Sequence, residues 1–394
     1  MTDLDERRAW IALAAARGVG EGIFGTLMAT FGRATEVLRA SLDGRLTAWI
    51  DEKRRLDGRS PISHTTLAEL VSIAADPGAK LRAIDALGLW TATPLDDDYP
   101  ARLRDLDPPP IVIHGLGSRE ALTRRRAVAV VGTRRPTAAG RALANKVCIR
   151  LVECGATVIS GLAVGIDGVA HAAVLDRRGL TVGVIGGGHC HPGPRAHSRL
   201  RAEVLAAGGA LISKYHPETK ASKGTYPRRN RIIAALSDAV IVIEAPRRSG
   251  ALITAHHALE LGRLVLVAPG RVGDWAMAGS LALLRETPAR PLVGLEEMVA
   301  DLGYFDAPVG DEQGVAVAAG GGDTGRREPA LAMLGTTERT VARRLCAGPA
   351  GLDLLVADTG LGPAVVSSAV TLLLMRGWVH AVGPAYVAAG PLAE

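Results

Sequence analysis

The residues best suited to chemistry lie in one basic run that contains a single aromatic side chain. The run Lys223-Gly-Thr-Tyr-Pro-Arg-Arg-Asn-Arg231 follows Lys220 and leads into an apolar segment that begins at Ile232. Its cations can neutralise phosphates, and the ring of Tyr226 can stack on a base, which contributes about 1–3 kcal/mol per base on single strands. A solvated charged loop is the alternative interpretation of this run alone. We expect a flexible basic loop before a helix over 231–237. Its candidate binding residues are Lys223, Tyr226, Arg228, Arg229, Asn230 and Arg231.

Three other loops each come directly after an apolar strand-like segment. In the first, Gly132 permits a tight turn and Arg134 can present a bidentate guanidinium to phosphate. The second, over 160–167, consists of small residues and opens a helix, whose N-terminus favours an anion. The third, over 249–254, offers hydroxyls and close backbone approach, although its serine has the alternative role of capping the next helix. The candidates from the second and third loops are Ser160, Gly161, Ser249, Gly250 and Thr254. Open parallel sheets bind ligands at the carboxyl ends of their strands, so we expect these loops to converge.

Two residues near the second loop have structural as well as functional interpretations. Asp167 would cap the helix or orient a hydrogen-bond donor, and His171 lies one helical turn further on. A pair between the two is one interpretation. A histidine that only packs in the core is the other, and it is the more frequent role of a lone helical histidine.

Several chemistries lack support in the sequence. Gly186-Gly-Gly188 does not match the spaced dinucleotide-binding fingerprint. His189-Cys190-His191 has no partner cluster at zinc-ligand spacing, and no nucleophile lies beside an evident base. We therefore expect no cofactor, no metal and no catalytic residue.

The composition is consistent with a globular protein that has an anionic partner. The 394 residues carry a formal net charge of +6, a mild excess that favours polyanions without proving that they bind. The four cysteines are far apart and suggest no disulfide framework. No apolar stretch reaches the roughly 18 residues of a membrane span, and the N-terminus lacks an export segment. We expect a cytoplasmic protein without a membrane span.

The pattern along the chain predicts three domains and a linker. Residues 1–80 are helical, and Gly18-Val19-Gly20 predicts a helix-hairpin-helix (SAM-like) unit or an ordinary helical hairpin. Residues 84–303 alternate apolar strands with helices, which predicts an α/β, Rossmann-like, doubly wound parallel sheet. Residues 304–328 are rich in Gly and Ala and predict a flexible linker. Residues 329–394 predict a winged helix.

The winged helix has few charges where it would meet DNA. Its third predicted helix, 363–375, has only Arg376 as a nearby cation. Since phosphate contacts dominate the affinity for DNA, this poverty of charge favours a protein contact or a weak DNA contact.

The ordered motifs together resemble the DNA-processing protein A family, also called DprA or Smf. The resemblance is strong over about residues 85–290, and both flanking domains match in type only. The matching pieces are Tyr99-Pro100 through Pro109, Gly132-Thr-Arg134 with Gly140, Ser160 through Asp167 with Ala170-His171, Thr181 with 186–188, Arg229-Asn-Arg-Ile-Ile233 with Leu236-Ser237, Glu244-Ala245, Ser249-Gly250 with Thr254, and Pro269-Gly270.

This resemblance implies a binding protein rather than an enzyme. Members of the family bind and protect single-stranded DNA, load the RecA recombinase during natural transformation, and form homodimers through the Rossmann-like domain. By position, Arg134, Lys223 and Tyr226 are similar to the strand-contacting residues of the family, with Arg229 and Arg231 nearby.

The chain departs from the family pattern at four places. Lys214 stands where an acid is usual and could strengthen DNA contact, and Gly193 stands in place of an expected tyrosine. Leu281 replaces an asparagine, and Thr287-Pro288 replaces a Gly-Ala pair. At the last two changes we expect the geometry of that end of the site, and of the dimer edge, to differ from the family pattern.

Two other functions are alternatives. One is a nucleotide-processing hydrolase similar to the phosphoribohydrolases, although the glycine-rich phosphate loop of that class is replaced by Ala245-Pro-Arg-Arg-Ser-Gly250. The other is a partner-docking module that retains only vestigial affinity for DNA.

Overall fold

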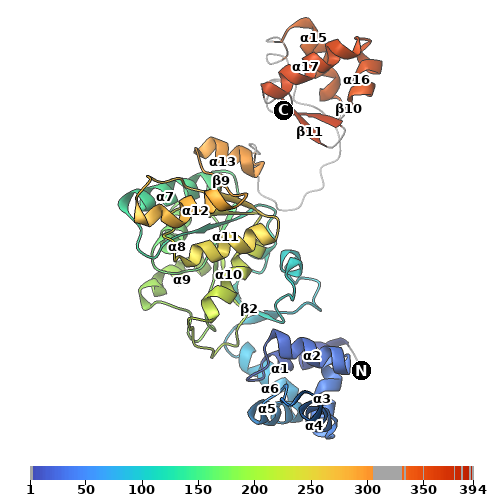
Figure 1. Ribbon diagram of the computed structural model, residues 1–394, viewed down its shortest axis with the longest axis vertical. Coiled ribbons are helices and arrows are strands. Elements are labelled where there is room, and N and C mark those ends of the chain that lie inside the picture. Colours follow the sequence, from blue (N-terminus) through green and yellow to red (C-terminus); the bar gives the residue numbers. More distant parts are fainter. Residues whose placement is uncertain are drawn as a thin grey trace. The chain divides into compact units, whose positions relative to one another are not determined.

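The computed structural model divides into two compact units, Met1–Val309 and Gly310–Glu394 (Figure 1). It describes residues 3–304, 331, 334–348, 350–376, 378–382, 385–389 and 392. The predicted linker over 304–328 lies outside the described residues except for Tyr304. The boundaries of the predicted domains therefore stay predictions.

Six helices form the N-terminal region, as the sequence predicts. They are α1 Asp3–Ala14, α2 Glu21–Phe31, α3 Ala34–Leu42, α4 Arg45–Asp57, α5 His64–Ala75 and α6 Pro77–Asp85. A turn with Gly18 at a φ of +88° joins α1 to α2, and glycine adopts this backbone conformation without strain. The side chains of Ser63 and Asp76 cap α5 and α6 by accepting backbone hydrogen bonds. Apolar side chains such as Leu13, Leu27 and Leu70 form the core between these helices.

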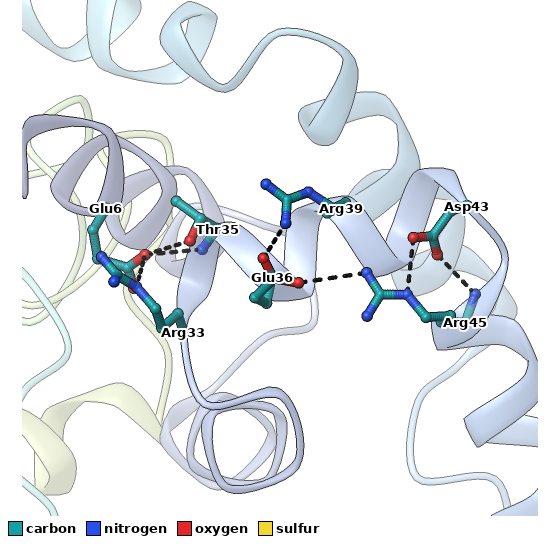
Figure 2. A network of polar contacts seen from close by, with 7 residues as sticks. All are labelled: Glu6, Arg33, Thr35, Glu36, Arg39, Asp43 and Arg45. Carbon is teal, nitrogen blue, oxygen red and sulfur yellow. Dashed lines mark hydrogen bonds and ion pairs between the residues drawn. The ribbon is translucent and has the colours of Figure 1, made fainter. Parts of the chain in front are cut away.

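A buried carboxylate on α1 holds the start of α3 (Figure 2). Glu6 accepts hydrogen bonds from the backbone N–H groups of Ala34 and Thr35 at 2.6 and 3.1 Å, and from the Thr35 hydroxyl at 2.7 Å. Arg33 donates a longer bond of 3.4 Å. Burial alone would raise the pKa of Glu6, but these hydrogen bonds outweigh it and lower the pKa below its usual value. More exposed ion pairs continue along α3 between Glu36, Arg39, Asp43 and Arg45.

The centre of the first unit is a nine-stranded sheet in the order β1-β2-β6-β5-β4-β3-β7-β8-β9. The strands are β1 Trp90–Ala92, β2 Ile113–Gly117, β3 Ala127–Val131, β4 Thr157–Ser160, β5 Thr181–Val184, β6 Ala210–Ser213, β7 Ala239–Val242, β8 Leu264–Val267 and β9 Arg290–Pro291. The seven strands from β6 to β9 in this order run parallel, while β1 and β2 are antiparallel to their neighbours. The Rossmann-like α/β fold predicted from the sequence is therefore confirmed.

Helices cover both faces of the sheet. They are α7 Ala138–Glu153, α8 Ile166–Asp176, α9 Ser198–Ala206, α10 Thr225–Leu236, α11 Gly250–Glu260, α12 Ala278–Glu286 and α13 Leu295–Leu302. Successive residues of β3 alternate between the two cores, since Ala129 and Val131 pack with α10 and α11 while Val128 and Val130 pack with α7 and α8. Burial on both faces explains the continuous apolar strands seen in the sequence.

The sheet changes winding direction between β3 and β7. From β3 the chain adds β4, β5 and β6 on one side, and it then returns to add β7 and β8 on the other side. The loops that leave the carboxyl ends of β3 and β7 therefore diverge and leave a crevice between them. Such a switch point is where open α/β sheets bind ligands.

The start of α10 differs from the sequence-based expectation. We predict a flexible loop up to Asn230 and a helix from Arg231, whereas α10 begins at Thr225. Pro227 lies in the first helical turn, where the missing N–H costs nothing and the fixed φ favours the helix. Tyr226 and the arginines that follow it are thus held on a helix.

The described part of the second unit contains the elements of a winged helix. These are α15 Thr336–Cys346, α16 Leu352–Thr359, α17 Pro363–Met375 and a sheet of β10 Ala350–Gly351, β11 Val379–Val382 and β12 Ala385–Ala388 in the order β10-β12-β11. Strands β11 and β12 pair in antiparallel orientation. Within the described ranges no single helix is long and apolar enough to cross a membrane. By length and composition alone, only α16 joined to α17 reaches that mark, as a pair bent by 114°.

Candidate nucleic-acid interface

A hollow of about 520 Å³ lies at the switch point of the sheet, and we call it the strand-end groove. Its walls are the loop after β3, the loop after β7 with the start of α11, and the first turns of α10. Eight of the predicted site residues line it, namely Gly132, Arg134, Tyr226, Arg229, Asn230, Ser249, Gly250 and Thr254. The sequence predicts that the loops after the strand ends converge, and in the fold these loops are adjacent.

The centre of the strand-end groove is a tyrosine ring with two guanidinium groups nearby. The guanidinium carbon of Arg134 lies 5.1 Å from the centroid of the Tyr226 ring, and that of Arg229 lies 5.9 Å from it. Arg134 is exposed and forms no hydrogen bond or ion pair with any residue that the structure describes. Tyr226 is half-buried. Within the described residues, a cation that has no hydrogen-bond or ion-pair partner and lies beside a half-buried ring suits a phosphate and its base.

Arg229 has a different role from Arg134 because it is only 3% exposed. Its Nη1 donates a hydrogen bond of 2.5 Å to the carbonyl oxygen of Gly161, just after β4, and another to that of Val184 at the end of β5. A Cβ on Gly161 would lie 2.2 Å from this Nη1 atom, so only glycine leaves room for the guanidinium. Burial lowers the pKa of Arg229. The side chain ties two strand ends to α10 and supports the Tyr226 ring.

Two buried titratable groups lie on α8, and one of them, Asp167, lines the groove. Burial raises the pKa of the Asp167 carboxyl, although Arg229 acts to lower it, and Asp167 accepts a 3.4 Å hydrogen bond from the Ala163 amide. His171 bonds through Nδ1 to the Thr181 hydroxyl at 2.7 Å, and burial lowers its pKa to about 3. The hydrogen bond of His171 therefore pairs it with Thr181 rather than with Asp167. This is the packing role considered for it from the sequence.

The third loop is held by short-range hydrogen bonds. The Ser249 hydroxyl accepts a 3.3 Å bond from the Ala251 amide, so Ser249 is the N-cap of α11, which is its alternative role. Asn230 donates through Nδ2 to the Gly250 carbonyl at 3.0 Å and thereby joins α10 to this loop. Thr254 is 1% exposed. These contacts fix the shape of the wall, and the exposed backbone of Gly250 remains at its surface.

Six predicted site residues do not line the strand-end groove. Ser160 is buried and donates to the Val130 carbonyl at 2.7 Å, and Gly161 is covered by the guanidinium of Arg229. Lys214 forms an ion pair with Glu21 of α2. The remaining three are Lys223 and Arg228, which are exposed, and Arg231, which donates to the carbonyls of Asp107 and Pro108.

Lys214 and Arg228 belong to a separate hollow of about 360 Å³. The turn between α1 and α2, including Gly18–Gly20, forms one wall of it, and Tyr215 and His216 lie on another. Basic and acidic side chains are mixed there, and the pair of Lys214 with Glu21 neutralises one cation. The positive charge of Lys214, which we expected to strengthen DNA contact, is thus neutralised by Glu21 of the same chain.

Three exposed groove residues with charged or aromatic side chains are missing from the sequence-based set. Arg135 and Arg248 are exposed on the loops after β3 and β7, and Trp275 is 67% exposed on the short 3-10 helix η4 Trp275–Met277. A tryptophan next to Gly273-Asp274, shortly after a strand end, is the signal that could have indicated it.

Comparisons with known proteins agree with this geometry. The family model of DNA recombination-mediator protein A matches residues 90–303, and a model of the DprA winged helix domain matches residues 325–383. The DNA processing protein DprA of Bacillus subtilis is 34% identical over 283 residues, which cover 69% of this chain and 94% of that protein. A putative DNA processing protein DprA of Mycobacterium tuberculosis is 35% identical over 333 residues, which cover 81% of each chain.

Two solved structures share the fold. DNA processing protein A of Streptococcus pneumoniae superposes with a TM-score of 0.54 at 30% identity, over 68% of this chain and 97% of that chain. DNA processing protein A of Helicobacter pylori gives 0.50 at 26% identity, over 54% of this chain and 95% of that chain. The second structure concerns a unique single-stranded DNA binding mode of that protein.

Proposed function

The chain belongs to the DNA recombination-mediator protein A family, and from this premise we propose that it binds single-stranded DNA in the strand-end groove. The observation that carries the proposal is the unpaired, exposed Arg134 beside the accessible ring of Tyr226 at the switch point of the sheet. The relative from Helicobacter pylori, whose structure concerns single-stranded DNA binding, supports it.

The groove favours a single strand over a duplex. Among the residues lining it, the one carboxylate is Asp167, which is buried, while the exposed charges are Arg134, Arg135 and Arg248. Each phosphate neutralised by these arginines releases counterions, so the affinity will fall steeply with salt. Stacking on Tyr226 needs an unpaired base and is tolerant of sequence. Binding should therefore be strong for any unpaired strand and weak for a duplex.

We further propose that the bound strand is protected and delivered to a RecA-type recombinase in natural transformation or homologous recombination. The site supports a binding role, since its titratable groups Asp167 and His171 are buried and its exposed groups are arginines. By the resemblance described above, the protein acts in the cytoplasm as a homodimer. Stimulation of RecA-catalysed strand exchange by the purified protein tests the delivery step, and light scattering tests the dimer.

The winged helix is proposed to contact protein rather than DNA. Helix α17 contains no basic residue, and Val365 and Leu372 on it are 44% and 42% exposed. A neutral, partly apolar helix lacks the phosphate contacts that dominate DNA affinity.

The experiment that tests the binding proposal is fluorescence anisotropy of a labelled single strand at two salt concentrations. The wild type should bind the strand tightly, and Arg134→Glu should abolish this binding. Arg59→Glu is the matched control, because it makes the same change of charge at an exposed arginine that lies away from the groove. Equal losses in both variants, or no loss in Arg134→Glu, would refute the groove as the binding site. Release of free base from a nucleoside monophosphate would instead favour the hydrolase alternative.

A further inference from the structure

Trp275 is held in solvent by an anchored turn. The indole is 67% exposed, while the next two residues of η4, Ala276 and Met277, are buried. The Asp274 carboxylate accepts a 2.9 Å hydrogen bond from the Ala276 amide and fixes the start of the turn. Met277 packs against Gly270, where a Cβ would lie 2.3 Å from it. The turn therefore presents a large apolar ring that the fold does not use, since within the described residues the indole makes no hydrogen bond or ring contact.

A second hollow of about 730 Å³ lies next to the strand-end groove, and we call it the outer basic hollow. Its charged and titratable lining residues are Arg134, Arg135, Arg141 and His197, and none of its lining residues is acidic. Arg135 and Arg141 are exposed. A hollow with cations and no carboxylate attracts anions, and its low-dielectric walls strengthen that field.

The first turn of α8 forms the floor of the outer basic hollow. Gly165 and Gly168 both line it, and no side chain caps the helix at Gly165. A Cβ on Gly168 would lie 2.8 Å from the His197 ring, so the missing side chain lets that ring approach the helix start. The N-terminus of a helix adds partial positive charge to the field of the arginines.

The two hollows share lining residues. Arg134, Arg135 and Trp275 line both of them, so the exposed indole stands at their common border. Tyr226 lines only the strand-end groove, and Arg141 lines only the outer basic hollow. Two aromatic side chains and several arginines along the two hollows provide the stacking surfaces and cations that bind single-stranded nucleic acid.

We propose that the outer basic hollow binds the nucleotides that continue from the strand-end groove, with a base stacked on Trp275 and phosphates on Arg135 and Arg141. This inference rests on the proposed binding of single-stranded DNA. It adds a second stacking position and lengthens the strand that one chain covers. The exposed indole is thereby explained as a binding surface.

The test is a titration of labelled oligothymidylates of about 4 to 20 nucleotides with the full chain and three variants. Trp275→Ala should weaken binding of the longer strands by about 5- to 150-fold, which corresponds to the loss of one stacked base, and should leave the shortest strands unaffected. Trp275→Phe should restore most of the affinity. Val272→Ala is the matched control, because Val272 is 96% exposed in the same loop and lines neither hollow.

A second readout distinguishes the outcomes. Quenching of tryptophan fluorescence by the long strand should be lost in Trp275→Phe, and light scattering gives the mass of each variant. If the wild type binds no strand, the proposed function itself fails. If Arg134→Glu abolishes binding while Trp275→Ala retains full affinity at every length, only the outer basic hollow is refuted. Unchanged affinity with a halved mass would identify Trp275 as part of an interface between copies of the chain.

Discussion

Replacement of the buried Arg229 by methionine should destabilise the first unit strongly, whereas the same change at the adjacent Arg228 should not. The guanidinium of Arg229 donates to the carbonyls of Gly161 and Val184 and lies near the buried carboxyl of Asp167. Arg228 is exposed and forms no hydrogen bond or ion pair within the described residues. The two arginines are one position apart on α10, so the pair isolates burial from residue type.

The expected loss follows from the contacts. Hydrogen bonds from a charged donor contribute about 1.5–3 kcal/mol each, so the two lost bonds sum to at least about 3 kcal/mol. Loss of the buried positive charge adds to this, because Arg229 is the stronger of the two arginines that act to lower the pKa of Asp167. The raised pKa of Asp167 limits this addition, because the carboxyl can take up a proton. We expect a loss of about 3–5 kcal/mol for Arg229→Met and less than about 0.5 kcal/mol for Arg228→Met.

Urea unfolding followed by tryptophan fluorescence measures both variants. Four of the five tryptophans lie in the first unit, at positions 10, 49, 90 and 275. Single-strand affinity is measured in parallel below the unfolding transition. If Arg229→Met retains the stability of the wild type but loses DNA binding as Arg134→Glu does, Arg229 contacts DNA directly and the positioning role is refuted.

Two further predictions concern the N-terminal helices and the loop after β4. Glu6→Gln should lower the free energy of unfolding by about 1–3 kcal/mol at pH 7. Because the folded state lowers the pKa of Glu6 from 4.5, this difference should be lost as the pH falls through the lowered pKa, and an equal difference in urea unfolding at pH 3 would contradict the reasoning. Gly165→Ala should cost more stability than Gly155→Ala. Both glycines have positive φ, but a Cβ at Gly165 would lie 2.6 Å from the Cα of Arg134, whereas the space at Gly155 is open. Gly165→Ala should also weaken binding of a labelled single strand, because it displaces the backbone of Arg134, and equal effects of the two substitutions on stability and binding would refute the steric argument.

The convergence of the site loops could be predicted from the sequence because it depends only on strand direction. Gly132 follows one buried strand and Ser249 follows another, and parallel strands place such loops at the same edge. The neighbouring basic run also indicates Tyr226, and the structure places this side chain beside Arg134. Local chemistry and strand order were sufficient for these features.

The roles of the individual cations could not be predicted because they depend on contacts between distant segments. Lys214 pairs with Glu21, 193 positions away, and Arg231 bonds to carbonyls more than 120 positions earlier. Adjacent residues on a helix differ by about 100° in direction. Because α10 starts at Thr225, Arg229 is buried and Arg228 is exposed. Nothing in the sequence alone distinguishes the two arginines.

The two edges of the large sheet constrain how copies of this protein can associate. One edge strand, β9, has only two residues, and the second is Pro291, which has no N–H to offer a partner. At the other edge, the carbonyl of Thr91 in β1 already accepts hydrogen bonds of 2.8 Å from Arg7 and Arg119. Short edges that are covered or contain proline resist strand addition and so protect against aggregation. A dimer of this chain would consequently join through helices and loops, with no sheet continuous across its two halves.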